Sequence, residues 1–242
     1  MRIIGVDLAS QASSTSLCAI DWTDRPRVVD LVRPADDDRI VAAAGSADAV
    51  GIDSPLGWPS AFVELIGRHH RGEATETVTA TSRELRLRTT DRWIRDWIPR
   101  DPLSVSTDRI GVVALRAVRL LERIRAPGCD RSGDGGIYEA YPGGSLARWG
   151  LTATGYKSRH AADVRATIVE ALSAWVEIDA AADRLVASDD DLDAVLTAVV
   201  TGLAVAGRTT APPPEYAAVA AAEGWIHVPT GPIEQIGAVS FE

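Results

Sequence analysis

Apolar residues near the start of the chain form short continuous runs that do not alternate with polar ones. Residues 2–9 read Arg-Ile-Ile-Gly-Val-Asp-Leu-Ala, and residues 49–56 repeat the pattern as Ala-Val-Gly-Ile-Asp-Ser-Pro-Leu. Such runs are typical of strands that are covered on both faces, inside a sheet. Each run carries an aspartate near its end, Asp7 or Asp53, and a buried carboxylate is costly unless a metal ion, a cation or hydrogen-bond donors compensate it. The pair indicates a site, although either aspartate alone could equally cap a turn.

The spacing of these runs and their neighbours predicts a mixed sheet. Five strands are expected, at residues 2–9, 17–22, 27–32, 49–53 and 137–142, and residues 223–229 are a candidate for a further one. Short connections between the first three favour an antiparallel meander. Residues 36–47 open with three aspartates and continue with helix formers, so a helix is expected before the strand at 49–53. A strand reached through such a crossover usually lies parallel to its neighbour.

Helical periodicity is clearest at residues 109–125, where apolar side chains recur at helical spacing. Further helices are expected over 159–175 and from Asp189 to about Ala206. With 242 residues and no visible repeat, the chain is expected to form one α/β domain, residues 1–242, with a basic helical insertion at about 60–131.

The composition indicates in which surroundings the protein is expected to occur. No apolar run reaches the roughly 20 residues that cross a bilayer, and the first residues enter a strand with no signal segment, so no membrane partner is expected. Two cysteines outside any paired motif suit a reducing, cytoplasmic location. The sequence leaves the oligomeric state open, a dimer included.

Charge is unevenly distributed. The net charge of -9 argues against a protein that coats nucleic acid, yet residues 68–131 hold fourteen arginines against nine acids. This basic segment could face an anionic ligand, or its charges could simply line solvated helix faces. Lys157 is the only lysine, beside 24 arginines, which weakly hints at a position that needs a compact point charge.

Several short motifs follow one another in a fixed order. They are Gly5-Val6-Asp7-Leu8-Ala9, Gly51-Ile52-Asp53-Ser54-Pro55-Leu56, Arg88-Thr89-Thr90-Asp91, Tyr138-Glu139-Ala140-Tyr141-Pro142, Tyr156-Lys157, Asp193-Ala194 and Glu223-Gly224-Trp225-Ile226. In this order they resemble the uncharacterised family of predicted ribonuclease H-like nucleases called domain of unknown function 429. The resemblance implies a ribonuclease H-like fold, whose element order the predicted strands and helices match, and a suspected nuclease activity.

The carboxylates then suggest a metal site. Neighbouring parallel strands lie about 4.8 Å apart, so Asp7 and Asp53 at equivalent strand ends could share a cation. Asp190 and Asp193 are spaced i,i+3 on one expected helix, similar to late helical aspartates of Holliday-junction resolvases, which have this fold. Oxygen ligands of this kind hold Mg²⁺ or Mn²⁺. The bland alternative is that these aspartates only stabilise a helix N-terminus.

Other polar residues complete the predicted site. Glu139, in the middle of a strand between two tyrosines, is a candidate catalytic carboxylate, and Lys157 and Arg88 are candidates for binding phosphate. Ordinary ion pairs would explain both cations equally well, and Asp91 could either join the site or start a helix. The Gly-rich turn at 133–136 lacks the Lys-Ser/Thr of a P-loop.

Three functions fit these patterns. The leading one is a metal-dependent nuclease or phosphodiesterase, acting on nucleic acid or on a small phosphate ester, with Asp7, Asp53, Glu139 and Asp193 as catalytic residues. The second is a nucleotide- or phosphate-binding ATPase or kinase of the same fold, in which the Ser/Thr-rich loop after Asp7 grips phosphate. The third is a non-catalytic interaction domain whose carboxylates are too dispersed to share an ion.

Overall fold

The computed structural model describes residues 1–98, 102–125, 128–178 and 180–241. Its strands are β1 (Arg2–Asp7), β2 (Ser16–Trp22), β3 (Pro26–Val32), β4 (Ala49–Asp53), β5 (Ile137–Ala140) and β6 (Ile226–His227). They form one sheet in the order β3-β2-β1-β4-β5-β6, in which β1, β2 and β3 are antiparallel and β1, β4, β5 and β6 are parallel. The sheet therefore has six strands where five were predicted with one further candidate, because the segment near residue 226 adds a short parallel edge strand.

Helices surround this sheet. They are α1 (Asp37–Ala44), α2 (Ser60–His70), α3 (Ser82–Arg86), α4 (Thr89–Trp93), α5 (Ile110–Ile124), α6 (Pro142–Arg148), α7 (Ala162–Ser173), α8 (Ala182–Ala187), α9 (Asp189–Val205) and α10 (Ala217–Glu223), with short 3-10 turns at Ala12–Ser14, Ile94–Asp96, Pro214–Tyr216 and Ile233–Ala238. Helix α5 spans Ile110–Ile124, where a helix over residues 109–125 was predicted. Helix α9 begins at Asp189, as predicted.

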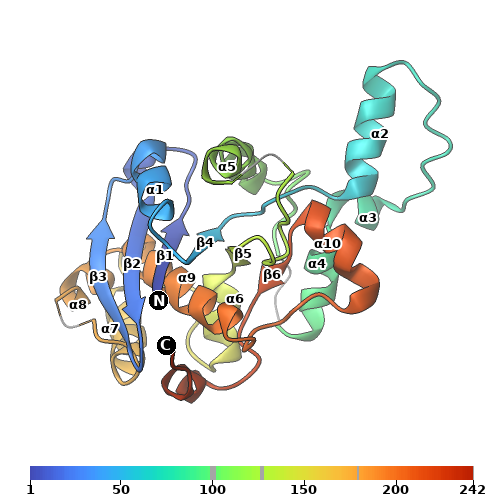
Figure 1. Cartoon of the computed structure of the whole chain (residues 1–242). Coiled ribbons are helices and arrows are strands. Elements are labelled where there is room, and N and C mark those ends of the chain that lie inside the picture. The colour runs from blue at the N-terminus through green and yellow to red at the C-terminus, as the bar shows by residue number, and fades with distance from the viewer. Residues whose placement is uncertain (99–101, 126–127, 179, 242) are drawn as a thin grey trace.

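The fold has three layers (Figure 1). Helix α9 runs across one face of the sheet against β1, β2 and β4, and α7 and α8 extend the same apolar core. Helices α1 and α5 cover the opposite face, where they pack on the other side chains of β1 and β4. Because β1 and β4 are covered on both sides, their apolar residues do not alternate with polar ones.

Two strand glycines determine how closely α9 approaches the sheet. A Cβ atom at Gly5 of β1 would lie 2.3 Å from the backbone oxygen of Ala194 and 2.3 Å from the backbone nitrogen of Ala198. At Gly51 of β4 it would lie 1.8 Å from the Thr201 hydroxyl. The α9 backbone therefore rests directly on the strands, and the first turns of α9 lie where β1 and β4 end.

The predicted basic insertion contains α2 to α5, and its residues 99–101 and 126–127 lie outside the described residues. Helix α2 projects from the body of the molecule, whereas α5 packs beside α1 on the sheet (Figure 1). Many of its arginines form ion pairs with carboxylates: Arg68, Arg71, Arg88, Arg92, Arg116 and Arg123. The alternative that these charges line solvated helix faces thus accounts for much of the charge of this segment.

Neither a membrane span nor a disulfide is found in the described part of the chain. None of its helices combines the length and the apolar character that crossing a membrane requires. Cys18 is buried and Cys129 half-buried, and both are free thiols.

Candidate metal centre

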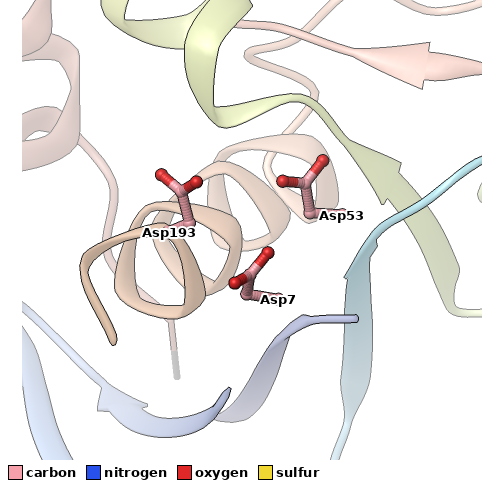
Figure 2. Close-up of side chains that lie close together, drawn as sticks. All are labelled: Asp7, Asp53 and Asp193. Carbon is pink, nitrogen blue, oxygen red and sulfur yellow. The ribbon is translucent and has the colours of Figure 1, made fainter. Parts of the chain in front are cut away.

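Three aspartates from three different elements meet at the carboxyl ends of the parallel strands (Figure 2). Asp7 ends β1 and Asp53 ends β4, and the two residues are directly paired in the parallel register. Asp193 comes from the second turn of α9. One carboxylate oxygen from each of the three lies within 4.8 Å of the others. Asp7, Asp53 and Asp193 thus lie together, as the sequence predicted. They are not dispersed as a non-catalytic interaction domain would have them.

Asp193 is the most enclosed of the three, with no exposed surface. The Tyr156 hydroxyl donates to its carboxylate, at 2.9 Å from Oδ1, and the Lys157 ammonium lies 2.5 Å from Oδ2. Consecutive residues therefore hold one carboxylate from the loop that precedes α7. The Lys157 side chain is still 55% exposed as a whole, although its ammonium is paired with the buried Asp193. Tyr156 was not predicted as a site residue and appeared only within the Tyr156-Lys157 motif. Its position next to the sole lysine is the feature of the sequence that could have identified it.

The electrostatics of the three aspartates favour a cation. Burial, followed by repulsion from Asp193 and Asp53, raises the pKa of Asp7 well above its usual range. Burial also raises the pKa of Asp53 to about 7, although Lys157 opposes this shift. For Asp193, burial raises the pKa while Lys157 and Tyr156 counteract it. Three crowded carboxylates with one lysine among them are under-compensated, and a divalent cation would relieve that repulsion.

The Lys157 ammonium responds to the same charges. Burial lowers the pKa of Lys157, but Asp193 and Asp53 outweigh it and raise the pKa above its ordinary value. The lysine therefore stays protonated at neutral pH and is a permanent cation of the site.

A cavity of about 540 Å³ opens above the aspartates. Asp7, Asp53 and Lys157 line it, together with residues of β5, the start of α9 and the segment before α5. Its size lies within the range of roughly 300–1,000 Å³ that pockets for whole small molecules occupy. Asp7 and Asp53 are therefore accessible from one defined chamber, whereas Asp193 lies buried behind it.

Asp190, predicted as a metal ligand, requires a correction. It lines the cavity, but its carboxylate pairs with Arg33 at 3.0 Å and it does not belong to the three-aspartate group. The neighbouring Asp191 is also engaged elsewhere, with the Ser16 hydroxyl and with Arg184 at 2.9 Å. Of the acids on the first turns of α9, the structure brings only Asp193 into the group of described ligand atoms.

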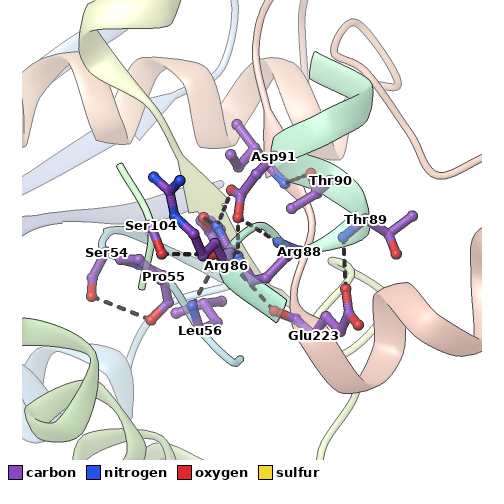
Figure 3. Close-up of polar contacts among 12 residues, drawn as sticks. Ser54, Pro55, Leu56, Arg86, Arg88, Thr89, Thr90, Asp91, Ser104 and Glu223 are labelled. Carbon is purple, nitrogen blue, oxygen red and sulfur yellow. Dashed lines mark hydrogen bonds and ion pairs between the residues drawn. The ribbon is translucent and has the colours of Figure 1, made fainter. Parts of the chain in front are cut away.

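Arg88, predicted to bind phosphate, also requires a correction. The side chain is buried, and all five of its N–H donors are directed at protein acceptors (Figure 3). Those acceptors are the carboxylates of Asp91 and Glu139 and the backbone carbonyl of Glu223. No donor is left for a phosphate, so Arg88 is a structural cation.

The same network explains Glu139 and Asp91. Glu139 accepts from Arg88 at 2.6 Å and from the backbone N–H of Leu56 at 3.0 Å, and it lies outside the three-aspartate group. Asp91 is the third residue of α4, and its carboxylate accepts a hydrogen bond from the backbone N–H of Arg88. It therefore stabilises the start of this helix. Glu139 therefore supports the segment that follows Asp53, and because it also lines the cavity its predicted catalytic role stays a prediction.

Two of the hydroxyls that follow β1 are engaged within the protein. The Thr15 hydroxyl donates to the Gln11 carbonyl and accepts from Arg116, and the Ser16 hydroxyl donates to Asp191. These hydroxyls are used to close the loop and to attach it to α5 and α9. Ser14 of the same loop lines the cavity, so the kinase-like alternative stays a prediction.

The class that this fold and site define is a three-layer α/β protein with a carboxylate centre at the ends of its parallel strands. The chain belongs to a protein family described as "Protein of unknown function (DUF429)", whose family model matches residues 5–217. Neither the curated proteins nor the solved structures contain a match. The family resemblance expected from the motifs is confirmed, and the family itself brings no established activity.

Proposed function

We propose that this protein is a metal-dependent phosphoesterase of the ribonuclease H-like class, the group that includes nucleases. The observation that carries the proposal is the group formed by Asp7, Asp53 and Asp193, whose oxygens lie within 4.8 Å of one another. Asp7 and Asp53 also line a cavity, and Asp193 lies buried behind them. The sheet order, with three antiparallel strands followed by parallel ones, and the position of α9 agree with that fold class.

The donor set fits a hard divalent cation. All three ligands are carboxylates, and Mg²⁺ and Mn²⁺ prefer oxygen donors of this kind. Burial is the largest cause of the raised pKa values of Asp7, Asp53 and Asp193, and repulsion among the carboxylates adds to it for Asp7 and Asp53. A bound ion would supply Lewis-acid polarisation of a phosphoryl oxygen and a more acidic water.

The remaining chemistry comes from the side chains around the carboxylates. Tyr156 donates to Asp193 and fixes its orientation, which is the usual role of a group behind a metal ligand. Lys157 lines the cavity, where its ammonium would receive a phosphate oxygen while it stays paired with Asp193. Arg88 and Glu139 hold the Leu56 backbone, and thereby the segment that follows Asp53.

The test combines metal binding with hydrolysis. We expect Mn²⁺ to bind the wild-type protein in calorimetry, and Asp7→Asn and Asp193→Asn each to weaken binding and slow hydrolysis by about a hundredfold or more. Asp190→Asn is the matched control, because Asp190 lines the same cavity but pairs with Arg33. Metal-dependent hydrolysis that survives in Asp7→Asn would refute the proposal, and so would equal losses in all three variants.

A further inference from the structure

The cavity above the aspartates is lined by two chemically different sets of side chains. Its floor is acidic and carries Asp7 and Asp53, with Lys157 beside them. Apolar residues also line the cavity: Leu8, then Pro102 and Leu103 of the segment before α5, and Ile110 and Val113 of α5. We call the last four the apolar wall. A ligand that fills this chamber would place a charged group at the floor and an apolar group against the wall.

Leu103 is the unusual member of this wall. Its side chain is 61% exposed although it is large and apolar, and it borders the cavity. Ile110 and Val113 of α5 follow it as partly buried residues of the same wall. Exposed apolar side chains beside a pocket are typical of ligand contacts, whereas a scattered exposed leucine elsewhere needs no explanation.

The surroundings of the cavity are unsuited to a long polyanion. Binding along a nucleic acid requires many unpaired Lys and Arg side chains that contact successive phosphates. Here the net charge is -9, and Arg116 and Arg123 of α5 are paired with Asp37 and Asp38. The outward face of α5 exposes Val112 and Leu115 beside an exposed arginine, Arg119.

We infer that the site accepts a small phosphate ester with one apolar or planar substituent, of nucleotide size, and not a nucleic-acid duplex. The phosphate would lie at the aspartates and Lys157, and the substituent would lie on Leu103 and the α5 wall. The inference rests on the proposed phosphoesterase function and specifies its substrate class. A cavity of about 540 Å³ holds such a molecule whole, whereas protein–DNA interfaces spread over about 1,000–2,500 Å² of protein surface.

Two substrates of different size test the inference with the full chain and Mn²⁺. One is thymidine 5′-(p-nitrophenyl) phosphate, a small diester with planar groups, and the other is a long DNA duplex, which we also supply as the separated single strand. We expect hydrolysis of the small diester and little of either polymer. Faster cleavage of duplex or single strand would overturn the substrate class and leave the phosphoesterase proposal standing. Hydrolysis of none of them would overturn both.

Substitutions of Leu103 and Val112 test where the substituent of the substrate binds. Leu103 is 61% exposed and lines the cavity, whereas Val112 is 57% exposed and does not. Leu103→Gln is expected to raise the KM for the small diester about tenfold and to leave kcat for methyl p-nitrophenyl phosphate nearly unchanged. Val112→Gln, which alters a similarly exposed side chain on the outer face of α5, should change neither.

A binding measurement gives a readout that does not depend on turnover. With Ca²⁺ in place of Mn²⁺, calorimetry of thymidine 5′-monophosphate should show weaker affinity for Leu103→Gln than for wild type and Val112→Gln. Equal affinities and equal KM values for the three proteins would overturn the assignment of the apolar wall, even if hydrolysis of the small diester is retained.

Discussion

The buried Arg88 network leads to the sharpest stability prediction. Arg88 compensates two buried carboxylates, at 2.8 Å from Asp91 and 2.6 Å from Glu139, and it also donates to the Glu223 carbonyl. In Arg88→Met the apolar stem is kept but every one of these contacts is lost. Asp91 and Glu139 then remain buried without their cation, because both are almost fully enclosed.

The magnitude follows from that burial. Removing one partner of a buried ion pair typically costs 3–5 kcal/mol, mainly because the other charge stays unpaired. For a chain of this size about 2–4 °C of melting temperature corresponds to each kcal/mol, so we expect a decrease of about 6–20 °C. The free energy of unfolding is measured by denaturant titration, and the melting temperature by calorimetry.

A surface ion pair supplies the control. Arg123 and Asp38 lie 2.6 Å apart, but their side chains are 44% and 86% exposed. Arg123→Met should therefore cost only about 0–1 kcal/mol. If Arg88→Met and Arg123→Met destabilise the protein equally, the reasoning that treats Arg88 as a buried structural cation is refuted.

Three further predictions concern the strand contacts and the metal centre. Gly5→Ala should destabilise the protein by about 1–3 kcal/mol or more in denaturant titration, since a Cβ there meets the α9 backbone at 2.3 Å, whereas Gly45→Ala, in helical conformation with open contacts, should not; equal effects would contradict the close approach. In metal-free buffer, the raised pKa of Asp53, about 7 against about 3.9 unfolded, means that the folded chain binds the proton more tightly. This contribution to stability therefore falls as pH rises from about 4 to 7, and a melting series should show Asp53→Asn losing that slope; parallel profiles would argue against it. Tyr156→Phe should weaken Mn²⁺ binding about tenfold in calorimetry by freeing Asp193, and an unchanged Kd would exclude this positioning role.

The sheet could be predicted from sequence because its central strands carry a strong local signal. The apolar runs that end in Asp7 and Asp53 reflect burial on both faces, and this property depends little on which helices supply the cover. The two-residue strand Ile226–His227 was only a candidate, because so short an edge strand is determined by its pairing with β5.

The roles of the polar residues were harder to predict for a physical reason. Arg88 is as compatible with phosphate as with an ion pair, and the choice depends on Glu139 and Glu223, which lie 51 and 135 residues away in sequence. The apolar wall of the cavity had no signal of its own, since Leu103 looks like any exposed leucine until its position above the carboxylates is known.

By itself the sequence determined where the central strands lie along the chain, the strand-end positions of Asp7 and Asp53, and the family, because these depend on local burial patterns and motif order. Only the tertiary structure decided that Asp193, and not Asp190, joins those two aspartates. The rotation of α9 about its axis makes that choice, and Gly5 and Gly51 set it by letting the α9 backbone rest on β1 and β4. Such long-range contacts leave no periodic trace along the chain.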